Sequence, residues 1–181
     1  MCGIVGYVGG RPAAPILVAG LKRLEYRGYD SAGVAVIGDG QLRCVRAVGR
    51  IAALESKLNG ATPDGSLGIA HTRWATHGAP TEANAHPHAD CSGRLALVHN
   101  GIIENYERLK ARLVECGHRF TSETDTEVVA HLIEEGLREQ PDLEAAVRGA
   151  LRQVQGTYGL AVLHLDFPDL LIAARCGSPL L

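Results

Sequence analysis

The sequence has few aromatic residues and no paired cysteines. Phe, Trp and Tyr make up 4% of its 181 residues, and Trp74 is its single tryptophan. The cysteines are Cys2, Cys44, Cys91, Cys116 and Cys176. Their number is odd, their spacing is wide and no CxxC pair occurs, which fits neither a disulfide framework nor a zinc motif. We therefore expect no metal, no cofactor, and a reducing compartment, the cytoplasm.

Long apolar runs and a strong charge of either sign are also absent. No run approaches the ~20 apolar residues of a transmembrane helix, and no basic segment precedes an apolar one, so we expect no signal peptide. The net charge of −2 gives no reason to expect a nucleic-acid or membrane partner. The chain is 46% hydrophobic and 21% charged, and no linker or repeat divides it. These features predict one globular domain over residues 1–181.

The N-terminus carries a cysteine directly after the initiator methionine. If Met1 is removed, Cys2 carries both a thiol and a free α-amine, whose pKa is about 7.7–8.0. A nucleophile beside its own terminal amine is one known route to activation. The alternative is that Cys2 is an ordinary residue at a frayed terminus. Against this, the apolar run that starts at Ile4 reads as a buried strand, which would hold the terminus in place.

The hydrophobic pattern predicts an α+β fold. We expect strands at 3–9, 32–37, 41–48, 67–71, 95–99, 158–165 and 170–174, and helices at 12–26, 50–58, 103–115, from about 122 to 138, and at 143–153. Gly38-Asp39-Gly40 is a hairpin signal between two of the strands. Hairpins indicate antiparallel sheets, and two stacked sheets with helices outside would bury this many apolar strands.

Two polar stretches have no hydrophobic period. Loops as long as residues 72–88 in a compact domain are usually functional or disordered. Disorder fits badly with an arginine, the tryptophan and several histidines in so short a stretch. Residues 27–33 form a shorter, glycine-bounded loop. We expect it to line the active site or a domain interface without a catalytic role.

Four motifs occur in an order that carries a family resemblance. They are Cys2-Gly3-Ile4-Val5-Gly6, Arg73-Trp74-Ala75-Thr76-His77-Gly78, His99-Asn100-Gly101 and Ser122-Glu123-Thr124-Asp125-Thr126-Glu127. Together they resemble the glutaminase domain of the class II glutamine amidotransferases, which are N-terminal nucleophile (Ntn) hydrolases. The resemblance implies a four-layer αββα sandwich of two mainly antiparallel sheets.

Within that family the chain is most similar to the glucosamine-6-phosphate synthases. The similarity rests on residues 23–33, 73–78 and 84–88, which read RLEYRGYDSAG, RWATHG and NAHPH. It implies hydrolysis of L-glutamine to L-glutamate and ammonia, which the parent enzyme delivers to fructose-6-phosphate. In such enzymes the glutaminase domain continues past Leu181, two sugar-isomerase domains follow, and the parent is expected to be a homodimer.

The resemblance also assigns catalytic roles. Cys2 would attack the side-chain amide of glutamine, while its terminal amine, through a water, takes the thiol proton. Asn100 and Gly101 would form the oxyanion hole that stabilises the tetrahedral intermediate. By composition alone, Asn-Gly is more often a turn than a site.

Charged residues of the motifs would recognise the free amino acid. Arg73 can hold the α-carboxylate through its planar fork, and Asp125 can hold the α-ammonium. Without the resemblance, Asp125 would be interpreted as a residue at a helix N-terminus whose negative charge is stabilised by the helix dipole. The two roles are compatible.

The remaining motif residues are expected to cover or support the substrate. Thr76 and His77 would contact glutamine, and Trp74 would form the gate between this site and an ammonia channel. His86 would support the site from behind. His86-Pro87-His88 could suggest a metal, but two histidines without a third ligand are weak evidence.

Two other functions stay open. The chain could belong to another class II amidotransferase, phosphoribosyl-pyrophosphate amidotransferase or asparagine synthetase, although Tyr26–Asp30 and Trp74 argue against both. It could also be a non-catalytic glutamine-sensing domain. The joint presence of Cys2, Arg73, Asn100, Gly101 and Asp125 argues against that alternative.

Overall fold

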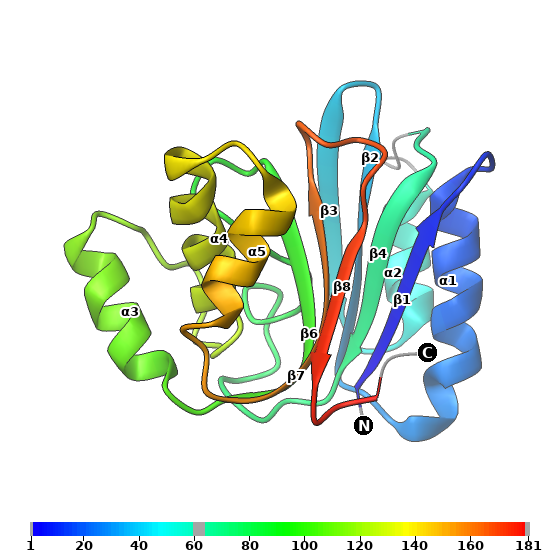
Figure 1. Ribbon diagram of the computed structural model, residues 1–181. Helices are drawn as coiled ribbons and strands as arrows, with labels where there is room; N and C mark the ends of the chain where they lie inside the picture. Colours follow the sequence, from blue (N-terminus) through cyan, green and yellow to red (C-terminus); the bar gives the residue numbers. More distant parts are fainter. Residues whose placement is uncertain (1, 60–63, 180–181) are drawn as a thin grey trace.

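Two stacked β-sheets form the centre of the molecule, and helices cover their outer faces. The computed structural model describes residues 2–59 and 64–179. Figure 1 shows the order helices, sheet, sheet, helices, with the two sheets face to face. The predicted four-layer αββα arrangement is confirmed.

The first sheet has the strand order β1-β4-β2-β3, and all neighbours are antiparallel. Its strands are β1 (Gly3–Val8), β4 (Leu67–Arg73), β2 (Ser31–Gly38) and β3 (Gln41–Val48). Helices α1 (Ala13–Leu24) and α2 (Ile51–Leu58) pack on its outer face (Figure 1). Leu17, Leu21 and Leu54 are completely buried in this layer. Leu17 and Leu21 are four residues apart, so they share the sheet-facing side of α1, and Leu54 belongs to the sheet-facing side of α2.

The second sheet has the order β5-β6-β7-β8, again antiparallel. Its strands are β5 (His88–Ala89), β6 (Leu95–Ile103), β7 (Gly156–His164) and β8 (Ile172–Cys176). Helices α4 (Glu127–Glu139) and α5 (Leu143–Leu151) lie on its other side, and α3 (Tyr106–Glu115) packs against α4 farther from the sheet (Figure 1). Residues Val128–Ile133 of α4 are almost completely buried, which makes α4 the central helix of this layer.

A separate core lies between the sheets. Ile69 of β4, Val98 of β6 and Leu163 of β7 are buried in it. Strands β2 and β4 are buried along nearly their whole length, because one face meets helices and the other meets the second sheet. This double burial explains why β2 and the first four residues of β4 read as apolar runs rather than as an alternation.

The structure confirms the hairpin and shifts several boundaries. Asp39 and Gly40 have φ of 51° and 68°, the backbone that a tight two-residue hairpin requires. Helix α1 ends at Leu24, and a single 3₁₀ turn, η1 (Glu25–Arg27), follows. The short strand β5 has no counterpart among the predicted elements.

One boundary shift matters for the site. The helix predicted to start at Ile103 begins at Tyr106, because residues 100–103 extend β6 and pair with residues 156–159 of β7. Asn100 and Gly101 therefore lie within a strand rather than in a turn. No helix in the described part of the chain is long and apolar enough to cross a membrane.

Candidate active site

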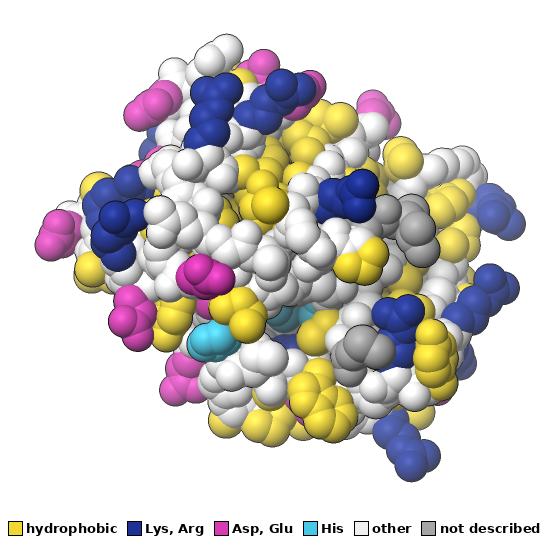
Figure 2. Space-filling view, turned by 60° about the horizontal axis from the view of Figure 1, so that its bottom comes forward, with side chains coloured by type: hydrophobic (Ala, Val, Ile, Leu, Met, Phe, Trp, Pro, Cys, Tyr) yellow, Lys and Arg dark blue, Asp and Glu magenta, His cyan; other side chains and the backbone are white. Residues whose placement is uncertain are grey.

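A cleft of about 640 Å³ lies at the end of the sheets where β1 begins. Figure 2 looks onto this end of the molecule, where histidine side chains are visible close to a hollow. All of the predicted site residues line the cleft: Cys2, Arg73, Trp74, Thr76, His77, His86, Asn100, Gly101 and Asp125. They come from the start of β1, the end of β4 and the loop after it, the end of β6 and the segment before α4. The fold thus unites four segments that are far apart in the sequence.

Cys2 is held beside the loop that follows β4. The antiparallel register pairs Gly3 with Thr72, which brings the preceding cysteine next to Trp74. The Trp74 backbone N–H donates to Cys2 Sγ at 3.2 Å, and Sγ lies 3.7 Å from the Trp74 carbonyl oxygen. The thiol is half-buried and opens onto the cleft. The predicted removal of Met1 lies outside the described residues.

Asn100 is oriented by a histidine that the sequence analysis did not select. His71 Nε2 lies 2.8 Å from Asn100 Oδ1. An amide oxygen only accepts, so the imidazole is the donor. Burial lowers the pKa of His71 to about 3, so the ring is neutral near pH 7 and its proton sits on Nε2. With its oxygen engaged, the Asn100 amide has its NH₂ group left for the cleft.

Gly101 occupies a position that only glycine fits. Its φ is +137°, a conformation that side chains rarely adopt. A Cβ there would collide with the Thr157 carbonyl oxygen and lie 3.0 Å from His99 Nε2. Glycine therefore lets the end of β6 approach β7 closely beside Asn100.

Arg73 is buried and holds the loop that follows it. Its guanidinium donates to the carbonyl oxygens of His77, Gly78 at 3.2 Å and Ala79 at 3.3 Å. Asp30 lies 3.9 Å from the same group. The guanidinium thus shapes the covering loop and also lines the cleft.

Asp125 presents a buried carboxylate from the segment before α4. One oxygen accepts from the Ile103 backbone N–H at 2.7 Å, and the other lies 3.9 Å from His77 Nδ1. Glu127 fixes this segment from inside, since its carboxylate accepts from the backbone N–H groups of Thr121 and Ser122, both at 2.8 Å. The Asp125 carboxylate is therefore anchored through its backbone and through one of its own oxygens.

Three further buried histidines form the floor behind the cleft. The His99 backbone N–H donates to His86 Nδ1 at 3.2 Å, and the His86 ring stacks on His71 with centroids 4.1 Å apart. His88 Nε2 lies 3.0 Å from the Thr124 hydroxyl. Burial lowers the pKa of His86 and His99, and that of His88 to about 3. The floor is therefore an uncharged hydrogen-bonded layer.

The loop after β4 forms the exposed wall of the cleft. Trp74 is 56% exposed, and its ring lies 3.1 Å from where a Cβ of Gly28 would stand. The backbone N–H of Ala75 donates to the Asp30 carboxylate. The loop at 27–33, which was expected to line the active site or a domain interface, thus contacts this cleft, and Arg27 lines it. The sequence analysis selected neither Asp30, which lies within the quoted stretch 23–33, nor His71, which lies two residues before Arg73, as a site residue.

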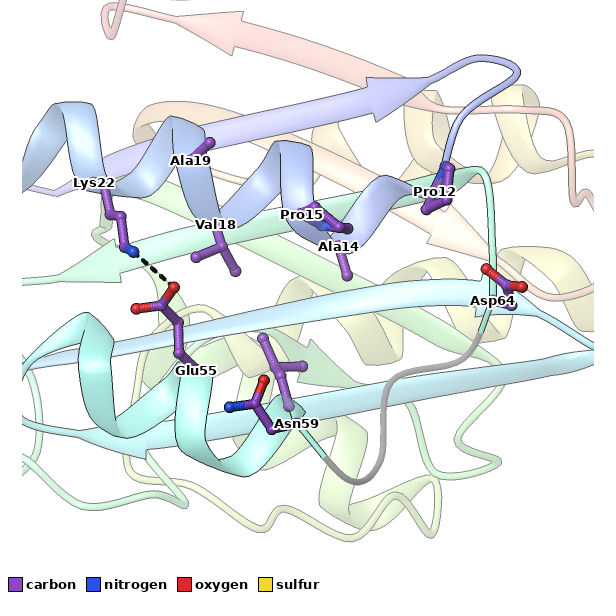
Figure 3. Close-up of a pocket in the computed structure, with 10 residues that line it drawn as sticks. Pro12, Ala14, Pro15, Val18, Ala19, Lys22, Glu55, Asn59 and Asp64 are labelled. Atoms are coloured by element: carbon purple, nitrogen blue, oxygen red, sulfur yellow. Dashed lines mark ion pairs between the residues drawn. The ribbon is translucent and has the colours of Figure 1, made fainter.

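A second cleft, of about 660 Å³, lies between α1 and α2. Figure 3 shows Lys22 and Glu55 pointing toward each other, and their ion pair measures 2.7 Å. Its described lining residues are mostly apolar and include neither cysteine nor histidine. Size alone does not separate the two clefts, but only the first contains a thiol next to buried charged groups.

Comparison with known proteins identifies the family. Residues 71–177 match the family described as "Glutamine amidotransferase domain". The chain belongs to this family.

Curated relatives show which members of the family this chain is most similar to among those compared. It is 54% identical to the glutamine–fructose-6-phosphate aminotransferase (isomerizing) of Pyrococcus horikoshii over 100% of its own length, and 59% identical to that of Gloeobacter violaceus over 99%. In both cases it spans 30% of the relative. The chain thus corresponds to about a third of the length of these curated relatives.

Solved structures support the fold. Glutamine phosphoribosylpyrophosphate amidotransferase from B. subtilis superposes with a TM-score of 0.79 at 28% identity, covering 97% of this chain and 37% of that one. A second structure, the allosteric regulatory enzyme of purine biosynthesis, gives a TM-score of 0.81 at 27% identity, with the same coverage. The Ntn amidotransferase fold is therefore established for this glutamine amidotransferase domain.

Proposed function

We propose that this chain is the glutamine-hydrolysing domain of a glutamine–fructose-6-phosphate aminotransferase and that it releases ammonia from L-glutamine. One observation carries the proposal. A single cleft is lined by a thiol, a fixed amide donor, a buried guanidinium and a buried carboxylate, at Cys2, Asn100, Arg73 and Asp125. These groups match the parts of a free glutamine molecule: an electrophilic amide, a carboxylate and an ammonium.

Recognition of the substrate would use the two buried charges. Asp125 would bind the α-ammonium with the oxygen that faces His77, since its other oxygen already accepts from Ile103. Arg73 would bind the α-carboxylate through its planar set of N–H donors. Because the same guanidinium holds three loop carbonyls, arrival of a carboxylate would be coupled to the position of the loop.

Catalysis would begin with attack of Cys2 Sγ on the amide carbon. After removal of Met1, the α-amine of Cys2, through a water, accepts the thiol proton, and a tetrahedral intermediate forms. Its oxyanion would be stabilised by the Asn100 NH₂ group and the Gly101 backbone N–H. The amine then returns the proton to the departing nitrogen, and the C–N bond breaks to leave a thioester and ammonia. Water attacks the thioester, the S–C bond breaks, and glutamate leaves with the thiol regenerated.

The covering loop would exclude water while ammonia forms. Thr76 and His77 would contact the bound glutamine, and Trp74 would act as the gate toward an acceptor site. His86, which stacks on His71 and accepts from His99, would support the oxyanion hole from behind. No metal or other cofactor takes part in this proposed reaction.

The parent protein would use the ammonia elsewhere. We propose that residues 1–181 are a type 2 glutamine amidotransferase domain without its C-terminal part. Sugar-isomerase domains of the parent would bind fructose-6-phosphate and convert it to glucosamine-6-phosphate, in a cytoplasmic homodimer. The names of the curated relatives support this acceptor over phosphoribosyl pyrophosphate, because identity to those relatives is 54–59% against 28% to the phosphoribosylpyrophosphate enzyme.

The decisive experiment combines mass and activity. The chain is expressed with its native start, intact mass reports removal of Met1, and glutamate release is measured with L-glutamine. We expect hydrolysis only in the fraction that lacks Met1 and none for Cys2→Ser. A non-catalytic glutamine sensor would bind glutamine without turnover, and a glutamine-like electrophile would leave Cys2 unlabelled in peptide mass spectrometry. Either result would refute the proposed function.

A further inference from the structure

Outside the cleft, four side chains form a cluster with the composition of a metal site. Cys91, His118, His131 and Glu134 each offer one ligand atom, and these atoms all lie within 4.8 Å of one another. Cys91 follows β5, His118 lies between α3 and α4, and the other two are three residues apart on α4, so they share one helix face. Thiolate, imidazole and carboxylate are the groups that Zn²⁺ takes as ligands.

Four of the six separations among the ligand atoms are close to the edges of a tetrahedron around one ion. Cys91 Sγ lies 3.7 Å from His118 Nδ1 and 3.6 Å from His131 Nδ1. Glu134 Oε2 lies 3.1 Å from His118 Nδ1 and 3.2 Å from His131 Nδ1. A tetrahedron with Zn–S bonds of about 2.3 Å and Zn–N or Zn–O bonds of about 2.0 Å has edges of roughly 3.5 Å and 3.3 Å. The four measured edges are close to these lengths.

The Nε2 atoms of the two histidines, which do not face the cluster, give a second and independent indication of a bound ion. His118 Nε2 and His131 Nε2 are buried and have no hydrogen-bond partner. Each nevertheless faces a carboxylate, since Nε2 of His118 lies 3.6 Å from Glu135 and Nε2 of His131 lies 3.7 Å from Glu127.

With neutral rings, the metal-free cluster leaves these nitrogens facing an acceptor without a proton to donate. If Glu134 accepts Nδ1–H from both neutral rings, each Nε2 carries a lone pair turned toward a carboxylate. An ion bound at both Nδ1 atoms would place the protons on Nε2, where each points at a carboxylate. Histidines that bind metals usually donate their other N–H to such a group.

The remaining contacts hold the thiol and the carboxylate beside the two histidines. Glu134 Oε1 is held by Arg138 at 2.5 Å, and Oε2, which faces both histidines, also accepts from the Cys91 backbone N–H at 3.1 Å. The Arg119 backbone N–H donates to Cys91 Sγ at 3.4 Å, which holds the sulfur in place beside the cluster. Because Cys91 is exposed while the other three side chains are buried, an ion can reach the cluster from the surface.

We propose that Cys91, His118, His131 and Glu134 bind one divalent cation of the Zn²⁺ type. One thiolate and one carboxylate balance its charge, and protein groups fill all four positions, which is typical of a structural rather than a catalytic site. The ion would fasten the segment after β5 and the α3–α4 connection to α4. The N-terminal end of α4 follows Asp125, so the ion would also steady one wall of the cleft.

Cobalt substitution tests the site with a readout that is separate from glutamine hydrolysis. The intact chain is stripped with a chelator and titrated with Co²⁺. We expect tetrahedral d–d bands and a sulfur-to-cobalt charge-transfer band that saturate at one equivalent and disappear on addition of Zn²⁺. Cys91→Ser abolishes the charge-transfer band. Cys116→Ser, which removes an exposed thiol two residues before His118 and outside the cluster, and Cys2→Ser leave the band unchanged.

A second measurement covers the case in which a cluster variant folds poorly. One equivalent of Zn²⁺ is expected to raise the melting temperature of the wild type and of Cys116→Ser, but not of Cys91→Ser or His118→Asn. The proposal is overturned if the wild type takes up no stoichiometric Co²⁺ or Zn²⁺. It is equally overturned if the charge-transfer band survives in Cys91→Ser or vanishes in Cys2→Ser, which would place the ion at the active-site thiol.

Discussion

His71 Nε2 donates a hydrogen bond of 2.8 Å to Asn100 Oδ1 and thereby fixes which end of the amide faces the cleft. The contact joins the two sheets, since His71 belongs to β4 and Asn100 to β6. The orientation of the proposed oxyanion donor is thus set by a neutral histidine on the opposite sheet.

Removing this histidine should lower turnover more than it weakens binding. For His71→Ala we expect kcat for glutamine hydrolysis to fall about tenfold, the effect of one lost hydrogen bond of ~1.4 kcal/mol, with KM nearly unchanged. Asn100→Ala removes the donor itself and should lower kcat by ~10²–10³. His71→Gln, whose side chain can still donate, should retain more activity than His71→Ala.

A double-mutant cycle distinguishes positioning from general damage to the fold. If His71 acts through Asn100, the double variant should be no slower than Asn100→Ala alone. Independent losses that multiply would contradict this role. Urea unfolding of each variant shows whether the fold has been kept.

Asp125→Asn tests the proposed ammonium site. The replacement has the same shape and can still accept from the Ile103 N–H, so the fold should persist. Loss of the charge should raise KM for glutamine by about 10- to 100-fold, because a hydrogen bond to a charged group contributes roughly 1.5–3 kcal/mol. Steady-state rates of glutamate release at a series of glutamine concentrations give this KM. Glu123→Gln is the matched control, since Glu123 is a neighbouring acid outside the cleft lining; an equal effect there would refute the assignment.

Gly101→Ala should damage both stability and activity. The new Cβ meets the Thr157 carbonyl oxygen at a φ of +137°, so we expect a loss of at least 1–3 kcal/mol in the free energy of unfolding. Gly117→Ala is the control, because its φ is also positive, at +89°, but nothing lies within 4 Å of the added carbon. Urea midpoints compare the two. Equal losses would show that backbone strain alone, and not the close approach of β7, requires glycine at position 101.

Acid should destabilise the fold through its buried histidines. Burial lowers the pKa of His71 and of His88 to about 3, whereas each titrates near 6.5 when unfolded. Below pH ~6.5 these histidines are protonated in the unfolded chain but stay neutral in the folded chain. The free energy of unfolding should therefore fall as pH drops from about 6.5 toward 3, by up to ~1.4 kcal/mol per pH unit for each histidine.

Urea unfolding at a series of pH values measures this slope. His88→Gln removes one titrating group and should make the slope shallower. Stability that stays constant between neutral pH and about pH 5 would mean that these histidines are charged or exposed in the folded chain.

Part of the fold and site followed from local sequence. Strands β2 and β4 are apolar runs, the Asp-Gly turn specifies its hairpin, and α1 repeats leucines at helical spacing, because these signals depend on residues near one another in the chain. The resemblance likewise named Cys2, Arg73, Asn100, Gly101 and Asp125 as a set, and all of them line one cleft.

Tertiary structure decided those features of the fold and site that depend on contacts between residues distant in the sequence. The strand predicted to end at His99 continues to Ile103, the residue where a helix was predicted to begin, because β7 supplies hydrogen-bond partners. His71 gained its relation to Asn100 only when the two sheets stacked. Cys91, His118, His131 and Glu134 have no recognisable metal spacing in the chain and meet only where α4 packs beside the segment after β5. Short-range patterns determine elements, but hydrogen bonding and coordination act between atoms a few ångströms apart, and only the folded chain brings such atoms together.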